Sequence, residues 1–179
     1  MSGKYRTIVA DPPWEVNAGP RSLHDPGERT RPLTYPTMTV DEIAAIPVSE
    51  MAAADAHLYI WTINAYVEQS YAIARAWGFK PSTLLVWAKA PKGRGLGGTF
   101  STATEYVLFA RRGSIRSTAR VDRNWWDWKR GKHSAKPEAF LDIVESVSPE
   151  PRLELFARRD RFGWQTWGNE SLGTAELAA

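Results

Sequence analysis

Cysteine is absent from this 179-residue chain, and histidine is scarce. Without thiols, the chain can form neither disulfides nor thiolate metal sites. The three histidines, His24, His57 and His133, stand far apart in the sequence and lack the spacing of metal ligands. The sequence therefore predicts a protein without a bound metal.

Long apolar runs and a signal-like N-terminus are also lacking, so we expect a cytoplasmic protein without a membrane partner. Hydrophobic residues make up 43% of the chain and charged residues 24%, which is typical of a globular protein. The length suffices for one hydrophobic core. We expect a single domain over residues 1–170, a flexible tail over 171–179, and a monomer or homodimer.

Positive charge exceeds negative charge only slightly, but it is unevenly distributed. The net charge is +3, and residues 111–136 contain nine Lys or Arg but only two Asp. Such a stretch suits a polyanion, although an ordinary solvated surface has the same composition. Trp125, Trp126 and Trp128 lie in this stretch, where we expect neither a buried strand nor a helix. Aromatic side chains among cations suit contact with unpaired bases.

Predicted strands and helices alternate along the chain. Apolar and β-branched runs predict strands over 5–10, 56–61, 83–88, 105–110 and 152–157. Helical spacing and capping signals predict a helix from the capping box at 39–42 to Pro47, one over 66–77 with Gly78 as C-cap, and one from Pro137 at its first position to about 147. Residues 15–36, 89–98 and 112–135 lack periodicity and are predicted loops. This alternation indicates an α/β sheet with helices on both faces, where ligands bind beyond the carboxyl ends of the strands.

The tetrapeptide Asp11-Pro12-Pro13-Trp14 directly follows the first predicted strand. The Asp11 carboxylate and a proline carbonyl offer two acceptors for the two N–H groups of an exocyclic amine. Acceptors at both positions would favour a more tetrahedral nitrogen whose lone pair can attack a methyl group. Trp14 offers a ring face for a base that is unstacked or flipped out of a duplex. A rigid turn with a buried Trp is the structural alternative.

Together with further motifs in the same order, this tetrapeptide resembles the MT-A70 family of adenine methyltransferases, whose characteristic motif is D-P-P-W. The resemblance covers the chain from Tyr5 to Glu170. The matching segments are Y-P-T-M at 35–38, W-G-F-K at 77–80, V-W-A-K at 86–89, a G-x-G…E element from Gly95 to Glu105, H-S-x-K-P at 133–137, E-L-F-A-R at 154–158 and G-W-x-x-W-G-N-E at 163–170. Each segment is weak alone, but chance agreement of all of them in this order is improbable.

This resemblance implies a Rossmann-like S-adenosylmethionine-dependent methyltransferase sheet with a permuted motif order, acting on the N6 amine of adenine in nucleic acid. It implies that Asp11, Pro12, Pro13 and Trp14 are catalytic. Lys136, just before a helix N-terminus, would meet the carboxylate of the cofactor, although it could be a solvated lysine. The other residues implied to bind the cofactor are Asp11, His133, Ser134, Phe156, Arg158, Asn169 and Glu170. Phe156 could instead be a core residue, and Glu154 could be a structural ion-pair partner.

On the substrate side, the resemblance and the charge pattern together predict two groups of residues. Trp14, Tyr35, Thr37, Met38 and Glu105 would surround the target base. Arg123, Lys129, Arg130 and Lys132 would contact the nucleic-acid backbone. We expect the long segments 15–36 and 112–135 to hold the nucleic acid.

Three functions remain open from the sequence. The first is adenine methylation on DNA by a small bacterial or phage-type enzyme, which the compactness of the chain favours by analogy. The second is the same reaction on RNA, since a 2′-hydroxyl contact cannot be read from the sequence. The third is a catalytically silent nucleic-acid-binding subunit on the same fold. The joint presence of the D-P-P-W motif with Lys136, Asn169 and Glu170 speaks against the third.

Overall fold

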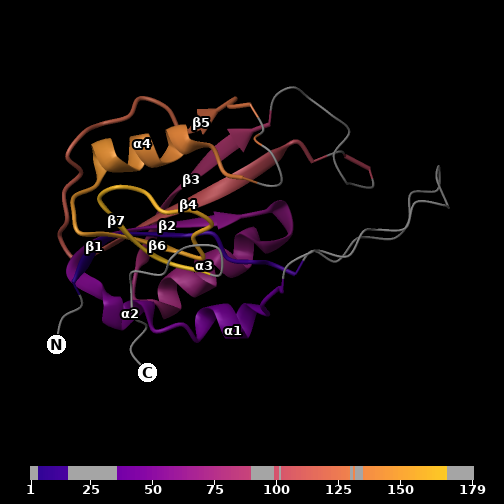
Figure 1. Cartoon of the computed structure of the whole chain (residues 1–179). Helices are drawn as coiled ribbons and strands as arrows, with labels where there is room; N and C mark the ends of the chain where they lie inside the picture. Colours follow the sequence, from indigo (N-terminus) through magenta and orange to yellow (C-terminus); the bar gives the residue numbers. More distant parts are fainter. Residues whose placement is uncertain are drawn as a thin grey trace.

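A seven-stranded sheet forms the centre of the computed structural model, which describes residues 4–15, 36–89, 99–100, 102–129, 131 and 135–168 (Figure 1). The strand order is β5-β3-β4-β2-β1-β6-β7. The strands are β1 (Tyr5–Ala10), β2 (Ala52–Thr62), β3 (Lys80–Ala88), β4 (Thr104–Arg112), β5 (Trp125–Trp126), β6 (Arg152–Leu155) and β7 (Trp164–Trp167). Only β4 is antiparallel to its neighbours, β2 and β3. The carboxyl ends of the other six strands therefore share one edge of the sheet with the amino end of β4.

Helices cover both faces of this sheet, as the alternating pattern predicts (Figure 1). The helices α1 (Val40–Ala44), α2 (Val48–Met51) and α3 (Val67–Ala76) lie on one face, and α4 (Glu138–Val147) lies on the other. The predicted capping box at α1 is present, since the Thr39 hydroxyl accepts a bond from the Glu42 backbone and the Glu42 carboxylate accepts one from the Thr39 backbone. Gly78 follows α3 with a φ of 81°, a left-handed conformation that glycine adopts without strain.

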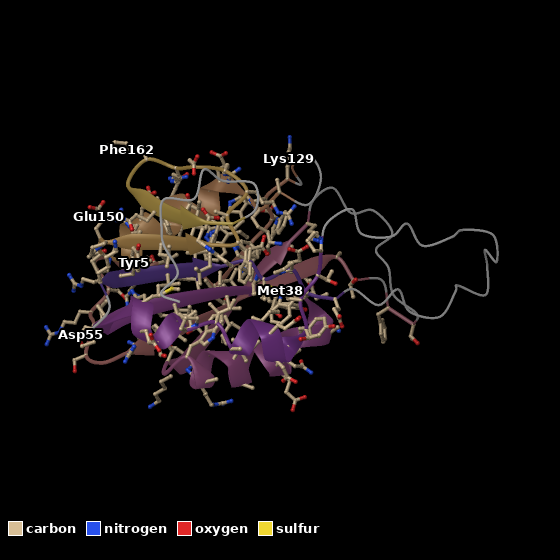
Figure 2. The ribbon with its side chains drawn as sticks, turned by 60° about the horizontal axis from the view of Figure 1, so that its bottom comes forward. Tyr5, Met38, Asp55, Lys129, Glu150 and Phe162 are labelled. Carbon is tan, nitrogen blue, oxygen red and sulfur yellow. The ribbon has the colours of Figure 1, made fainter. Side chains whose placement is uncertain are left out.

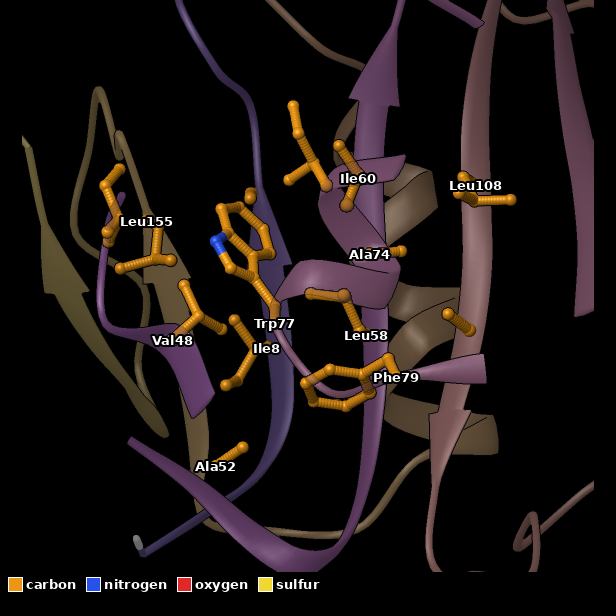
Figure 3. Close-up of a cluster of buried hydrophobic side chains, with 14 of the residues drawn as sticks. Ile8, Val48, Ala52, Leu58, Ile60, Ala74, Trp77, Phe79, Leu108 and Leu155 are labelled. Atoms are coloured by element: carbon orange, nitrogen blue, oxygen red, sulfur yellow. The ribbon is translucent and has the colours of Figure 1, made fainter. Parts of the chain in front are cut away.

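Two hydrophobic clusters hold the layers together. In the first, Ile8, Leu58 and Ile60 of the sheet pack with Ala74 of α3 and Trp77 (Figure 3). The second lies under α4 and contains Val9, Tyr59, Trp61, Val107, Phe140, Leu141 and Val144. Consecutive residues of β1 enter opposite clusters because side chains alternate along a strand. Burial on both faces explains why β1 is apolar almost throughout.

Several element boundaries differ from those that the sequence predicts. The strand β2 starts at Ala52 and β3 at Lys80, so both are longer than predicted. The first helix ends at Ala44, before Pro47, which instead caps α2. Pro137 is the N-cap of α4 rather than its first residue. The strand β6 ends at Leu155 and not at residue 157, because Phe156 takes a φ of 61° that no strand permits.

Two short strands were not expected from the sequence. The strand β7 follows β6 without a helix between them. The strand β5 lies within the predicted loop 112–135, and Trp126 in this strand is 9% exposed. The prediction that the tryptophans of this segment lie outside buried strands is therefore wrong for Trp126. The cause is pairing with β3, in which Val86 and Trp87 align with Trp125 and Trp126.

Among the described residues, no helix combines the length and apolar character that a membrane crossing requires. The same part of the chain contains no group of three acidic or histidine side chains placed to hold a metal ion. The expected boundary between a domain ending at residue 170 and a tail lies outside the described residues and stays a prediction.

Candidate active site

The two ends of the sheet differ in the residues that they carry. Figure 2 shows Met38 and Lys129 toward one end, and Asp55, Glu150 and Phe162 toward the opposite end. Met38 pairs with Trp14, just beyond the carboxyl end of β1. The end of the sheet marked by Met38 and Lys129 is therefore the edge where the strands present their carboxyl ends, and where α/β sheets bind ligands. We call it the carboxyl edge.

The segment after β1 forms a compact turn at this edge. The backbone N–H of Trp14 donates to the carbonyl of Pro12 at 2.9 Å, and that of Met38 donates to the carbonyl of Pro13 at 2.9 Å. The structure thus places Met38 beside the motif, and the expected contact of Thr37 and Met38 with a target base stays a prediction. Each proline carbonyl already accepts one bond and retains a second lone pair for another donor.

Trp14 is held firmly in place by its neighbours. Its ring is 5% exposed, its Nε1 donates to the Trp61 carbonyl at 2.9 Å, and its face stacks on Tyr66 with centroids 4.9 Å apart. The Tyr66 hydroxyl donates in turn to the Glu15 carbonyl at 2.6 Å. Trp14 therefore belongs to the core here, and Tyr66 occupies one of its two faces. Its contact with a target base stays a prediction.

Four charged side chains from separate parts of the chain form a line at the carboxyl edge. The Lys136 ammonium lies 3.0 Å from an Asp11 oxygen and 3.1 Å from a Glu105 oxygen, and Lys89 pairs with the other Glu105 oxygen. Lys136 also lies over the ring of Trp61, 5.2 Å from its centroid. The signs alternate from Lys89 through Glu105 and Lys136 to Asp11. Lys136 is thus not the solvated lysine that the sequence left open.

These contacts shift the pKa values of the two middle residues of the line, Glu105 and Lys136. Burial alone would raise the pKa of Glu105, but the charges of Lys136 and Lys89 outweigh it and lower the pKa. Burial would lower the pKa of Lys136, but Asp11 and Glu105 outweigh it and raise the pKa. Both groups therefore stay charged near neutral pH. The described side chains of this line are only 14–21% exposed.

The end of β6 lies beside the end of β1, as the sequence hypothesis requires. The backbone N–H of Asp11 donates to the Leu155 carbonyl at 3.3 Å, which joins the two strand ends directly. Phe156 follows in a left-handed conformation that costs a non-glycine residue about 1–3 kcal/mol. Its half-buried ring packs edge-on against Trp167, with centroids 5.5 Å apart. Arg158 is half-buried after this turn.

Glu154 is the acidic residue of β6 and is half-buried. Its Oε2 atom is buried and has no hydrogen-bond partner among the described residues. Burial raises its pKa to about 7, with a contribution from Asp11, against the opposing charges of Arg159 and Arg161. In the described part of the chain, Oε2 therefore does not act as a satisfied ion-pair partner, which was the structural role left open for Glu154.

The ends of β6 and β7 approach each other closely at the same edge. The Ala157 N–H donates to the Trp167 carbonyl at 3.0 Å, and any side chain at Gly168 would collide with the backbone of Ala157. Several predicted site residues fall outside the described residues, and their roles stay predictions: Tyr35, Arg130, Lys132, His133, Ser134, Asn169 and Glu170.

The basic stretch is divided between the two ends of the sheet. The strand β4 ends at Arg112, where Arg111 aligns with His57 in the middle of β2, and the Arg112 guanidinium donates to the Ser49 carbonyl at 2.7 Å. Figure 2 places Lys129 at the carboxyl edge, and both Arg123 and Lys129 are exposed. The cations of residues 111–136 therefore do not all lie at one end of the sheet, because β4 carries Arg111 and Arg112 to the end opposite Lys129.

Three residues of the site had no assigned role from sequence reasoning. Lys89 pairs with Glu105, Tyr66 stacks on Trp14, and Trp61 lies under Lys136. The position of Lys89 directly after a strand was a usable signal, because polar residues at strand ends gather at one edge of such a sheet. No local pattern distinguishes Tyr66 or Trp61 from ordinary core residues.

Comparison with known proteins agrees with these features. The MT-A70 family model matches residues 5–170. The chain is 32% identical to the type II methyltransferase M.MunI of Mycoplasma sp, over 93% of this chain and 78% of that protein. It is 26% identical to a putative N(6)-adenosine-methyltransferase MT-A70-like protein of Medicago truncatula and 24% identical to the human N(6)-adenosine-methyltransferase catalytic subunit METTL3. These matches cover only 27% and 28% of the two eukaryotic proteins. The family expected from the sequence motifs is confirmed, and the chain belongs to the MT-A70 family.

Proposed function

We propose that this protein transfers a methyl group from S-adenosylmethionine to the N6 amine of adenine in a nucleic acid, with DNA as the favoured substrate. One observation carries the proposal. The Asp11 carboxylate, held by Lys136, lies where the ends of β1 and β6 meet. An amine acceptor and the expected cofactor strand therefore share the carboxyl edge.

Asp11 and the proline carbonyls would hold the amine. The carboxylate accepts one N–H, and a remaining lone pair on the Pro12 or Pro13 carbonyl accepts the other. Binding both N–H groups orients the nitrogen and leaves its lone pair free, so the contribution of these residues is alignment. The nitrogen loses a proton only after it has become cationic, and water can accept that proton. Asp11 therefore need not act as a strong base.

The residues at the edge fit the charges of the cofactor. S-adenosylmethionine carries a carboxylate, an ammonium and a sulfonium, and it supplies an electrophilic methyl group when bound. Lys136 would hold the carboxylate, and the acidic side chains Asp11 and Glu154 suit the positive groups. Oε2 of Glu154 has no donor within the described part of the chain, and this supports the assignment, because a buried acceptor without a donor is costly unless a ligand satisfies it. The remaining proposed contacts are Phe156, Arg158, His133, Ser134, Asn169 and Glu170.

The choice of DNA rests on the contrast between relatives. The higher identity and the greater coverage belong to a relative named a type II methyltransferase. The relatives with lower identity are named for adenosine, the ribonucleoside, and the chain matches only about a quarter of their length. RNA is the second candidate, and a cytoplasmic location is part of the proposal.

A methyl-transfer assay tests the proposal directly. Tritiated S-adenosylmethionine is supplied with matched single-stranded DNA, duplex DNA and RNA, and the products are identified by nucleoside mass spectrometry. We expect N6-methyladenine, with more product on DNA than on RNA. Calorimetry of cofactor binding runs in parallel, with Lys136→Ala as the control. Absence of both methylation and cofactor binding in the wild type would favour a silent nucleic-acid-binding subunit.

A further inference from the structure

The strand β5 places one large aromatic side chain in solvent near the carboxyl edge. Trp125 is 54% exposed, whereas Trp126 is 9% exposed. Trp126 aligns with Trp87 of the second hydrophobic cluster, so it faces α4 and stacks on Trp128 with centroids 5.0 Å apart and planes 6° apart. Alternation along the strand directs Trp125 to the opposite face. Its exposure therefore follows from a fixed backbone position.

The backbone that presents Trp125 is well anchored. The Val86 N–H donates to the Asn124 carbonyl at 2.8 Å, and the Asn124 side chain donates to the Leu84 carbonyl at 3.1 Å. On the other side, the Trp87 indole donates to the Trp128 carbonyl at 2.8 Å. The ring is thus held on a rigid part of the sheet, which lowers the entropy cost of stacking a ligand on it.

A row of side chains on the same face connects Trp125 with the candidate active site. The strand register places Trp125 beside Val86, Val86 beside Tyr106, and Tyr106 beside Thr62. The chain then continues from Thr62 into the short 3₁₀ helix of residues Asn64–Tyr66, whose Tyr66 stacks on Trp14. From β1 to β5 there are four strand spacings, or about 19 Å.

Charge around β5 favours a polyanion. In the sequence, residues 120–132 contain five cations and two acids, and the structure describes three of these cations, Arg120, Arg123 and Lys129, and both acids, Asp122 and Asp127. Arg120 forms an exposed ion pair with Asp122, while Asp127 is exposed beside Trp126. An exposed indole among excess cations is the combination that binds single-stranded nucleic acid, because the ring stacks on a base and the cations meet phosphates.

We infer that Trp125 stacks on an unpaired base of the nucleic-acid substrate, several nucleotides away from the adenine held at Asp11. This inference rests on the proposed function. It adds the path that the nucleic acid takes across the protein, and it adds that the nucleic acid is single-stranded at Trp125. A stacked strand rises about 3.4 Å per nucleotide, so about 19 Å corresponds to five or six nucleotides. A short flank beside the adenine cannot reach Trp125, and a long flank can.

The test measures binding by fluorescence anisotropy with two labelled single-stranded DNA probes. Each contains one adenine within thymines, with flanks of two or of ten nucleotides on each side. The variants are Trp125→Ala, Trp125→Phe and the control Phe162→Ala, which removes a fully exposed aromatic ring from the opposite end of the sheet (Figure 2). Thermal melting establishes that each variant is folded.

We expect Trp125→Ala to weaken binding of the long probe by about tenfold and to leave the short probe unchanged. Trp125→Phe should retain most of the affinity, and Phe162→Ala should match the wild type. Equal behaviour of Trp125→Ala and Phe162→Ala on the long probe would overturn the inference. So would a loss of self-association in Trp125→Ala by sedimentation velocity, since Trp125 would then contact a second copy of the chain.

Failure of this inference is distinguishable from failure of the proposed function. Binding is measured without methyl transfer, so a protein that does not methylate can still show the length-dependent loss. Conversely, if the wild type methylates adenine but Trp125→Ala binds both probes normally, the proposed function stands and the inference falls.

Discussion

The Lys136 ammonium lies 3.0 Å from the Asp11 carboxylate, which joins the segment before α4 to the turn after β1. Because Glu105 and Lys89 extend this contact into a line of alternating charges, Lys136 is fixed at the position where it would meet a cofactor carboxylate. In the proposed function the same cation has two roles, because it would orient Asp11 and also attract the carboxylate of the cofactor.

Replacing Lys136 by methionine should affect both stability and binding. The change leaves Asp11 without its cation in a mostly buried setting, so we expect a loss of about 2 kcal/mol in the free energy of unfolding. Cofactor affinity should fall at least tenfold. Urea denaturation and calorimetry measure the two effects. The control is Lys80→Met, an exposed lysine at the start of β3, which should change neither. Normal cofactor affinity in Lys136→Met would remove Lys136 from the cofactor site.

Tyr66 should support activity through Trp14. Tyr66→Ala removes the stacked ring and should slow methyl transfer about tenfold, because Trp14 and the turn that precedes it lose a fixed position. It should also lower stability by about 1 kcal/mol. Tyr66→Phe keeps the ring and should retain the rate. The matched control is Tyr71→Ala in α3, a half-buried tyrosine packed on the same cluster. If both alanine variants lose the same fraction of activity, Tyr66 has only a general packing role.

The titration of Glu154 predicts a loss of stability with rising pH. Its pKa is raised to about 7 in the folded state, against 4.5 for an ordinary glutamate, so the folded state binds the proton more tightly. This stabilising contribution of Glu154 is full below pH 4.5 and is lost as the pH rises through 7, by about 3 kcal/mol in total. Urea denaturation between pH 5 and 8.5 measures it. Glu154→Gln should lack this decline, and an equal decline in that variant would show that another group causes it.

The titration of His57 predicts the opposite effect in the acidic range, where stability should fall as the pH is lowered. It is fully buried, with Nδ1 2.8 Å from the Ser148 hydroxyl. Burial, together with the charges of Arg111 and Arg6, lowers its pKa to about 4 from 6.5. The unfolded chain therefore binds the proton more tightly, and the free energy of unfolding should fall by about 3 kcal/mol as the pH drops from 6.5 through 4. His57→Asn, which retains a polar group toward Ser148, should flatten this part of the curve without changing cofactor affinity.

The sequence predicts those elements that depend on neighbouring residues or on a regular pattern of apolar residues along the chain. The capping box at Thr39, the glycine after α3 and the apolar run of β1 each predict an element that the structure contains. The strand β5 is different, since its two residues form a strand only because β3 supplies their partners. Likewise, β6 ends early because of the backbone conformation of Phe156, which its side-chain type does not indicate.

In the candidate site, too, the features that depend on local sequence were predictable, and those that depend on distant segments were not. The position of Asp11 at a strand end follows from the α/β pattern and is confirmed, whereas its direct contact with the end of β6 depends on the strand order, which the pattern does not predict. The pairing of Asp11 with Lys136 and Glu105 does not follow from it, because the three residues come from distant segments. The division of the basic stretch was also unpredictable from composition, since it depends on where β4 ends.

The most direct measurement compares methyl transfer by the wild type and by Asp11→Asn at saturating cofactor and oligonucleotide. The asparagine keeps the size of the side chain but replaces one acceptor oxygen with a donor. We predict that turnover, followed as N6-methyladenine by mass spectrometry, falls at least about a hundredfold, while cofactor affinity stays within about fivefold of the wild type by calorimetry. Turnover within threefold of the wild type would contradict the claim that the Asp11 carboxylate holds the amine.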